Sequence, residues 1–440
     1  MCKTKRIIGL LLMLVVVFSV GCSNKENVAK EETVETEVTE EVTEAATEVA
    51  KEPTSLFVSR WAGPHADTQK EIIKDYADSM VTMDDVDYGN LKQKQILSFQ
   101  SKPGDGNYDV VWVNYFWMKE YVENGYLLPI DDYIKESGLD TSMYSKSMMD
   151  SCVIDSKTYG LPTFAQTLIL TYDSVALENA GLEVPKTTDD LIAVAKYFKE
   201  TEGTGIALPA KQGGASTQVY AQILFGTGGY YFNEEGMIDF TSEESIYAAK
   251  AYDELAKYSL DGSLAWHHDD VAEAVRTGLA PIGITMSALA NLNADPDQSR
   301  IVDTVKYAPL PGKDGDVVGN NQFWVWAIAK NTEKPQESFD FIKWFTSPEI
   351  EKSQTLINQQ VSGITALSED AEVKEAAPFI AVVMEALSSA KMDPVLKETQ
   401  TMKDALIATL SEIASTDVDP EEAMKKLQET LKDVDFSDYK

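Results

Sequence analysis

The chain has 440 residues, which is long enough to build two domain-sized hydrophobic cores. Its formal net charge of −34 excludes nucleic acid as the expected partner, because binding to phosphates requires basic patches. Such an acidic balance fits a soluble protein that works outside the cytoplasm and repels its neighbours.

Residues 1–22 have the pattern of an export signal. A positively charged start precedes the apolar run Ile7–Val20, which is too short to span a membrane comfortably. The run ends in FSVGC (residues 18–22), which resembles the lipobox of bacterial lipoproteins, although Ser19 stands where that pattern prefers Leu. The sequence therefore predicts a lipoprotein signal peptide over 1–22 with lipid on Cys22. The alternative is an ordinary secretory signal followed by an incidental cysteine.

Residues 23–54 form a low-complexity segment. They are rich in glutamate, threonine, valine and alanine and show no apolar periodicity. Because such a segment cannot bury enough apolar surface to fold, we predict a disordered acidic tether over 23–54.

The segment after this tether reads as a strand, a loop and a helix. The run SLFVSRW (55–61) has strand chemistry, a loop with Gly and Pro follows, and residues 67–80 show helical spacing. Trp61 ends the strand and is a ligand candidate, because sugar rings stack their C–H faces on indoles. His65 follows in the loop and could donate to a ligand hydroxyl. Trp61 could equally belong to the core, and His65 could be a simple loop residue.

Residues 108–133 carry the strongest local pattern. The nearly continuous apolar run 109–113 suits a strand buried on both faces, and a helix over 116–124 follows it. In open α/β sheets, ligands bind beyond the carboxyl ends of the strands. Asn114 and Tyr115 would lie at such an end, where an amide and a phenol suit a ligand rich in hydroxyls. The alternative is that Asn114 only caps the helix.

The order of several segments resembles a known family. YDVVWV (108–113) is followed by ENGYLLPIDDY (123–133), by a long stretch from YGLPTFAQ to LIAVA (159–195), and by AEAVRTGLAPIGITM (272–286). In this order, and after a lipobox, these segments are similar to the family 1 extracellular solute-binding proteins. These are maltose-binding-protein-like carbohydrate receptors of ABC importers. The likeness covers most of residues 55–440.

The resemblance implies an α/β fold of the two-lobed periplasmic-binding-protein type II kind, with hinge crossovers, a helical C-terminal tail and the ligand held between the lobes. By position in the family, we expect lobe 1 to comprise 55–164 and 280–324, and lobe 2 to comprise 165–279 and 325–440. The crossovers are expected near Phe164–Leu168 and near Gln322–Ala327.

Further ligand contacts follow from the same comparison, for Gln166 and Tyr220, and from the residues themselves, for Ser287, Asn321 and Gln322. Gln166 lies in the crossover motif, where maltose-binding protein carries an acidic contact. Tyr220 precedes a glycine-rich turn in a region that often supplies an aromatic platform. Ser287 ends a strand-like run, and Asn321 and Gln322 belong to an amide cluster that suits hydroxyl recognition, although turn formation explains the cluster equally well.

Catalytic signatures are missing from the sequence, which has no G-x-S-x-G, H-E-x-x-H or P-loop motif. The pair His267-His268 lacks a third histidine nearby, so we expect no metal and no cofactor. We therefore predict an extracytoplasmic, lipid-anchored monomer that is not an enzyme and that delivers a carbohydrate to an ABC permease. The alternatives are a secreted carbohydrate-active enzyme, and the same receptor fold with a polyol or other small solute.

Overall fold

The computed structural model describes residues 54–63 and 65–439. The predicted signal peptide and its lipidation site Cys22 lie outside the described residues, as does the predicted tether apart from Thr54. Within the described part of the chain, no helix is long and apolar enough to cross a membrane.

The first sheet has five strands in the order β2-β1-β3-β11-β6. Strand β1 (Thr54–Trp61) pairs in parallel with both β2 (Ser79–Val86) and β3 (Val110–Asn114). Strand β11 (Gln322–Ile328) is antiparallel to β3 and to β6 (Leu161–Gln166), and lies between them. All five residues of β3 are buried, as the continuous apolar run of the sequence predicts.

The second sheet has four strands in the order β10-β7-β9-β8. Strand β7 (Leu168–Asp173) is its centre and pairs antiparallel with β10 (Val305–Pro309) and β9 (Ile282–Met286). Strand β8 (Ile206–Ala207) is parallel to β9. Each sheet has its own large cluster of buried apolar side chains, so the chain builds two cores. A separate hairpin joins β4 (Val153–Ile154) to β5 (Lys157–Thr158).

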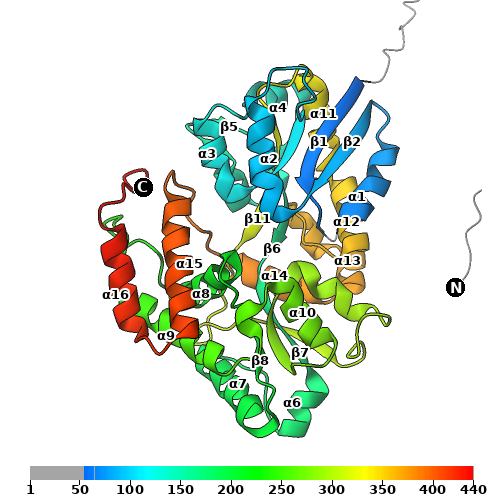
Figure 1. Ribbon diagram of the computed structural model, residues 1–440. Coiled ribbons are helices and arrows are strands. Elements are labelled where there is room, and N and C mark those ends of the chain that lie inside the picture. The colour runs from blue at the N-terminus through cyan, green and yellow to red at the C-terminus, as the bar shows by residue number, and fades with distance from the viewer. Residues whose placement is uncertain (1–53, 64, 440) are drawn as a thin grey trace, which may run out of the picture. The chain divides into compact units, whose positions relative to one another are not determined.

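Helices pack on both sheets, and Figure 1 shows α15 and α16 beside α8 and α9 of the second core. The α-helices of the described residues are α1 (Ala66–Ile72), α2 (Tyr88–Gln100), α3 (Met118–Glu123), α4 (Asp131–Ser137), α5 (Lys146–Ser151), α6 (Ser174–Ala180), α7 (Thr188–Glu202), α8 (Gly214–Gly226), α9 (Glu243–Lys257), α10 (His268–Arg276), α11 (Pro335–Phe345), α12 (Pro348–Asn358), α13 (Ala371–Ala376), α14 (Phe379–Ser388), α15 (Thr399–Ser415) and α16 (Pro420–Leu431). Short 3-10 helices are η1 (Ile73–Asp75), η2 (Tyr115–Trp117), η3 (Thr141–Met143), η4 (Ser263–Ala265), η5 (Ser287–Ala294) and η6 (Thr365–Glu369).

Local chemistry explains where the helices begin and end. Thr187 caps α7 in a capping box, in which its hydroxyl accepts from the Asp190 N–H and the Asp190 carboxylate accepts from the Thr187 N–H, both at 3.0 Å. Gly203 ends the same helix with a left-handed φ of 70°. This helix therefore occupies the range that its cap and its stop signal define.

The structure divides the chain between the two cores differently from the division expected by position. Residues 280–324 were expected in lobe 1, yet β9 and β10 pair with β7 in the second sheet. Residues 325–440 were expected in lobe 2, yet most of β11 and helices α11 to α13 pack on the first core. The reason is that a buried apolar run shows that a strand exists but not which sheet it joins. Of the described residues in that range, α15 and α16 pack on the second core together with Leu396 and Phe436.

Three segments carry the chain between the sheets. The first is Thr167, between β6 and β7, which lies within the range expected from the resemblance. The second crossover occupies 310–321 and so precedes the range expected for it, because Gln322–Ala327 is already inside β11. A third passage, 389–398, joins α14 to α15 and was not expected. The second and third are paired through backbone bonds of Lys391, whose N–H donates to Gly319 and whose carbonyl accepts from Asn321, at 3.0 and 2.9 Å.

Candidate functional site

Four strands of the first sheet end or begin at one edge, and each brings a predicted contact to it. Because β1 and β3 are parallel, Trp61 and Asn114 stand at neighbouring carboxyl ends. Strand β11 starts at this edge, with Trp324 opposite Asn114. Gln322 pairs with Gln166, the last residue of β6. The topology therefore brings together side chains that are far apart in the sequence. Trp61 and Gln322, for example, are 261 positions apart.

Aromatic rings form one wall of this edge. The indole of Trp61 stacks on that of Trp324, with ring centroids 5.6 Å apart and an interplanar angle of 9°. Tyr88 meets the edge of Trp61 at 6.1 Å and stacks on Trp117 at 5.8 Å. Trp324 is fully buried, whereas Trp61 is half-buried and Tyr88 is 41% exposed. Trp61 therefore packs on the core and is also reached by solvent. The interpretation as a core residue and the interpretation as a ligand contact do not exclude each other.

Several buried amides at this edge have a polar atom without a hydrogen-bond partner. Such atoms are the Oδ1 of Asn114, the Oε1 of Gln166, the Oδ1 of Asn321 and the Nδ2 of Asn320. All four side chains are at most 8% exposed. An unpaired buried polar group costs about 1–3 kcal/mol, so a set of them at one place favours a partner that the described residues do not supply. These atoms are suited to hydrogen bonds with a polar ligand.

His65 lies beneath the aromatic wall rather than on its surface. Its ring is 1% exposed and packs 4.8 Å from the ring of Trp112 and 5.3 Å from that of Phe164, and its Nε2 has no partner. Burial lowers the pKa of His65 to about 3, with the nearby Arg60 guanidinium adding to the effect, so the imidazole is neutral. Phe164 has a strained backbone φ of 28° in this crossover strand.

We expect acid to destabilise the protein through its buried histidines. Burial also lowers the pKa of His268, which contacts Gln218, to about 3. Below the unfolded-state pKa of about 6.5 the unfolded chain binds a proton that the folded state refuses, so stability present above that pH is lost as the pH falls towards 3. Between about pH 7 and pH 5 each histidine should cost about 2 kcal/mol. Urea unfolding of His65→Gln should show that much less pH dependence, and an unchanged dependence would contradict the assignment.

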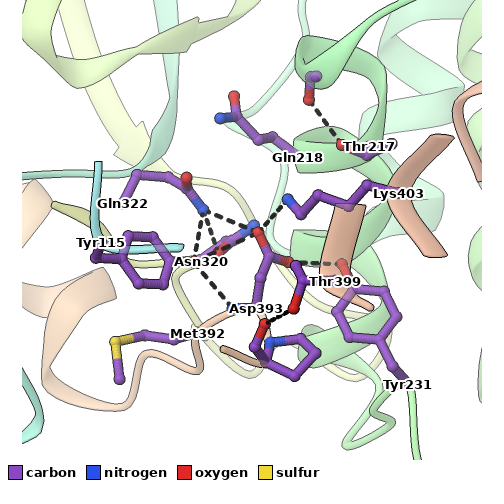
Figure 2. Close-up of polar contacts among 12 residues, drawn as sticks. Tyr115, Thr217, Gln218, Tyr231, Asn320, Gln322, Met392, Asp393, Thr399 and Lys403 are labelled. Carbon is purple, nitrogen blue, oxygen red and sulfur yellow. Dashed lines mark hydrogen bonds and ion pairs between the residues drawn. The ribbon is translucent and has the colours of Figure 1, made fainter. Parts of the chain in front are cut away.

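Tyr115 and Gln322 belong to a buried polar cluster around Asp393 (Figure 2). The Asp393 N–H donates to the Tyr115 hydroxyl at 3.1 Å, and the Gln322 Nε2 donates to the Asp393 carboxylate at 3.3 Å. Lys403 forms an ion pair with this carboxylate at 2.5 Å, and Tyr231 donates to it at 2.8 Å. Tyr115 is therefore a buried anchor whose ring stacks on Phe323, and is not an exposed platform.

Asp393 and Lys403 were missed by sequence reasoning. They lie ten positions apart in an unremarkable stretch, and nothing local indicates that both are buried. The sequence offered one signal for this cluster: Pro394 and the polar residues around it follow a helix, and no strand begins there. A cavity of about 550 Å³ lies beside the cluster, lined by Asp393, Met392 and Tyr230 together with residues of α5 and the β4–β5 hairpin. None of the nine predicted contacts lines that cavity.

Two predicted contacts are placed elsewhere. Tyr220 is fully buried in the second core, and its hydroxyl contacts Ser245 at 2.5 Å. The prediction of an aromatic platform there is not supported, because α8 is buried on nearly all sides and turns the ring inward. Ser287 lies beside the first crossover, where its Oγ accepts from the Thr167 N–H at 3.2 Å. Its hydroxyl is therefore engaged with the backbone of the chain.

Comparisons with known proteins agree with this architecture. A family model described as bacterial extracellular solute-binding protein matches residues 62–352. A probable amino-acid ABC transporter periplasmic-binding protein of Sinorhizobium fredii is 24% identical over 365 residues, 78% of this chain and 81% of the relative.

Solved structures of two-lobed binding proteins superpose on the chain. A maltose-bound protein of T. maritima has a TM-score of 0.78 at 20% identity, covering 86% of this chain and 99% of that protein. A solute-binding protein of Agrobacterium radiobacter in complex with ribitol has a TM-score of 0.75 at 22% identity, covering 87% and 99%. The predicted two-lobed α/β fold is confirmed. The chain belongs to the bacterial extracellular solute-binding proteins, the receptors of ABC importers.

Proposed function

We propose that this protein binds an uncharged carbohydrate at the strand-end edge of the first sheet and delivers it to an ABC permease. The observation that carries the proposal is the group of partnerless amide atoms on Asn114, Gln166 and Asn321 beside the partly exposed ring of Trp61. A sugar offers what this arrangement lacks, because its hydroxyls bond to amides and its ring face stacks on an indole.

The energetics of such a complex are adequate for a receptor. Micromolar binding requires about −8 kcal/mol. Each buried amide that gains a hydroxyl partner relieves a penalty of about 1–3 kcal/mol, and stacking on Trp61 adds to this. A solute that contacts both lobes in one arrangement shifts the equilibrium towards that arrangement by its difference in affinity. The ligand would thereby create the surface that the permease recognises.

Charge pairing favours a neutral solute over an amino acid, the cargo class in the name of the Sinorhizobium relative. Near the site, Lys403 is paired with Asp393, and the buried Arg60 is bonded to Asp85 at 2.6 Å. An amino acid needs charged partners for its ammonium and its carboxylate. In these two pairs the charged side chains of the protein already neutralise each other. A polyol, the ligand class of the ribitol-bound neighbour, satisfies the same amides and is the second candidate.

The setting of the receptor is part of the same proposal. The lipobox-like segment ending in Cys22 and the acidic segment 23–54 support an extracytoplasmic receptor anchored by lipid and held off the membrane. Mass spectrometry of the mature N-terminus tests this anchor. A lipid adduct on Cys22 supports it, and an unmodified cysteine contradicts it.

A ligand panel tests the function and its enzymatic rival together. The purified full chain is titrated with maltose, maltotriose, ribitol, D-mannitol and glutamine, with thermal unfolding and calorimetry as readouts. We expect a sugar or polyol to stabilise the folded state by about 2.7 kcal/mol at a hundredfold excess over Kd, with the ligand recovered intact. Binding of glutamine alone would contradict the carbohydrate assignment. Shortening of maltotriose would establish an enzyme instead.

A further inference from the structure

The carboxylate of Asp393 is the centre of a buried network that joins both cores. Its side chain is 0% exposed, and its partners Tyr231 and Lys403 belong to the second core and to α15. Its partners Tyr115 and Gln322 belong to the first core and to β11. Figure 2 shows Asp393 between these two groups, with Tyr115 and Gln322 on one side and Lys403 and Tyr231 on the other.

This carboxylate dictates the orientation of the Gln322 amide. An ionised carboxylate only accepts hydrogen bonds, so the amide must turn its NH₂ group, and not its oxygen, towards Asp393. The Nε2 of Gln322 lies 3.3 Å from Asp393 Oδ2 and 2.9 Å from Asn320 Oδ1. The Tyr115 hydroxyl is a third acceptor at 3.5 Å, so both hydrogens of the NH₂ group are engaged. The same carboxylate forms the ion pair with Lys403 at 2.5 Å, which adds a charge-assisted hydrogen bond to the network.

The same logic passes one residue further, to Asn320. Because Gln322 donates to the Oδ1 of Asn320, the Nδ2 of Asn320 must face away from Gln322. That nitrogen is buried and has no hydrogen-bond partner, in a side chain that is 1% exposed. Asp393 therefore fixes the orientation of the Gln322 amide, and Gln322 in turn fixes that of the Asn320 amide. The result is a hydrogen-bond donor without a partner just before β11.

The neighbouring hydroxyls reinforce this polarity. Burial, with the Asp393 carboxylate as the next cause, raises the pKa of Tyr115 and of Tyr231 well above the ordinary value. Both hydroxyls thus remain protonated and can donate to the carboxylate. All the hydrogen-bond partners of the Asp393 carboxylate among the described residues are therefore donors. None of them favours the reversed orientation of the Gln322 amide.

We propose that Asp393, paired with Lys403, is a positioning residue that fixes the amides of Gln322 and Asn320, so that the Asn320 Nδ2 is the donor for a ligand oxygen. The inference rests on the proposed function, and it adds Asn320 as a contact that determines specificity. A ligand that has a methylene group in place of this oxygen is rejected, because it leaves the Asn320 donor unpaired.

Side-chain amide NMR of the full chain tests the positioning without any ligand. Asp393→Leu/Lys403→Met removes both charges together and leaves no unpaired ion. We expect hydrogen exchange of the Gln322 amide to accelerate about tenfold or more in this variant, because its carboxylate acceptor is gone. The control is Asp150→Asn, which alters an exposed ion pair of the same 2.5 Å length and should leave this amide unchanged. Equal exchange in the double variant and the wild type would overturn the proposal.

Binding of maltose and ribitol tests the role of Asn320. Asn320→Asp keeps an oxygen that accepts from Gln322, replaces the donor with a second acceptor oxygen and adds a buried negative charge. We expect affinity for whichever probe the wild type binds to fall about tenfold or more, and unchanged affinity would overturn the role of Asn320. If the wild type binds none of the sugars and polyols of the ligand panel, the carbohydrate assignment fails, while the exchange measurement still decides whether Asp393 positions Gln322.

Discussion

Asp393→Asn is expected to lower the free energy of unfolding by about 3–5 kcal/mol, since it strands the charge of Lys403 in the interior. Lys403 is 8% exposed in its side chain, and Asp393 is its only carboxylate partner among the described residues. A buried ammonium without a counter-charge carries its full desolvation cost. Denaturant unfolding of the two proteins at the same pH measures the difference.

Two further variants make this expectation specific. Asp393→Asn/Lys403→Met removes both charges and should recover most of the loss, because replacing a buried pair by neutral groups is often close to neutral in stability. Asp150→Asn makes the same chemical change in the exposed pair with Lys146 and should alter stability by at most about 0.5 kcal/mol. A double variant no more stable than Asp393→Asn would show that the stranded charge is not the cause.

Replacing the partnerless amide of Asn114 by an apolar isostere should stabilise the free protein and weaken ligand binding. The Asn114 side chain makes no hydrogen bond to the described residues, and its Oδ1 is buried. Asn114→Leu therefore removes an unsatisfied group and should raise the free energy of unfolding by about 1–2 kcal/mol. Affinity for the sugar or polyol identified by the ligand panel should fall about tenfold to a hundredfold, because a ligand hydroxyl then loses its acceptor.

This opposition between stability and binding distinguishes a ligand contact from a structural cap. A cap would lose stability on substitution, as the alternative interpretation of Asn114 requires. The structure records no side-chain cap from Asn114 to η2, which favours the ligand interpretation. Asn124→Leu serves as the control at an exposed helix end and should change neither the affinity nor, by more than about 0.5 kcal/mol, the stability. Lower stability of Asn114→Leu with unchanged affinity would contradict the assignment.

The sequence by itself predicted β1, β3 and the ends of these strands, whereas the helix expected over 67–80 ends at Asp75 and strand β2 begins at Ser79. The buried run 109–113 predicted β3, and the polar residues that follow it placed Asn114 at a strand end, since both signals depend only on neighbouring residues. The capping box of Thr187 and Asp190 at the start of α7 is a signal of the same local kind. The order of such segments was sufficient for the family, because the order of motifs does not require knowledge of their packing.

Only the tertiary structure decided which residues meet. The insertion of β11 between β3 and β6 sets Gln322 opposite Gln166, a pairing that no local pattern encodes. The tertiary structure also decided that Tyr220 turns into the second core. It likewise placed Asp393 and Lys403 at the centre of a network that spans both cores. The physical reason is that hydrophobic burial is non-directional: an apolar run specifies that a segment is buried, whereas its partners are selected by the global packing of all segments at once.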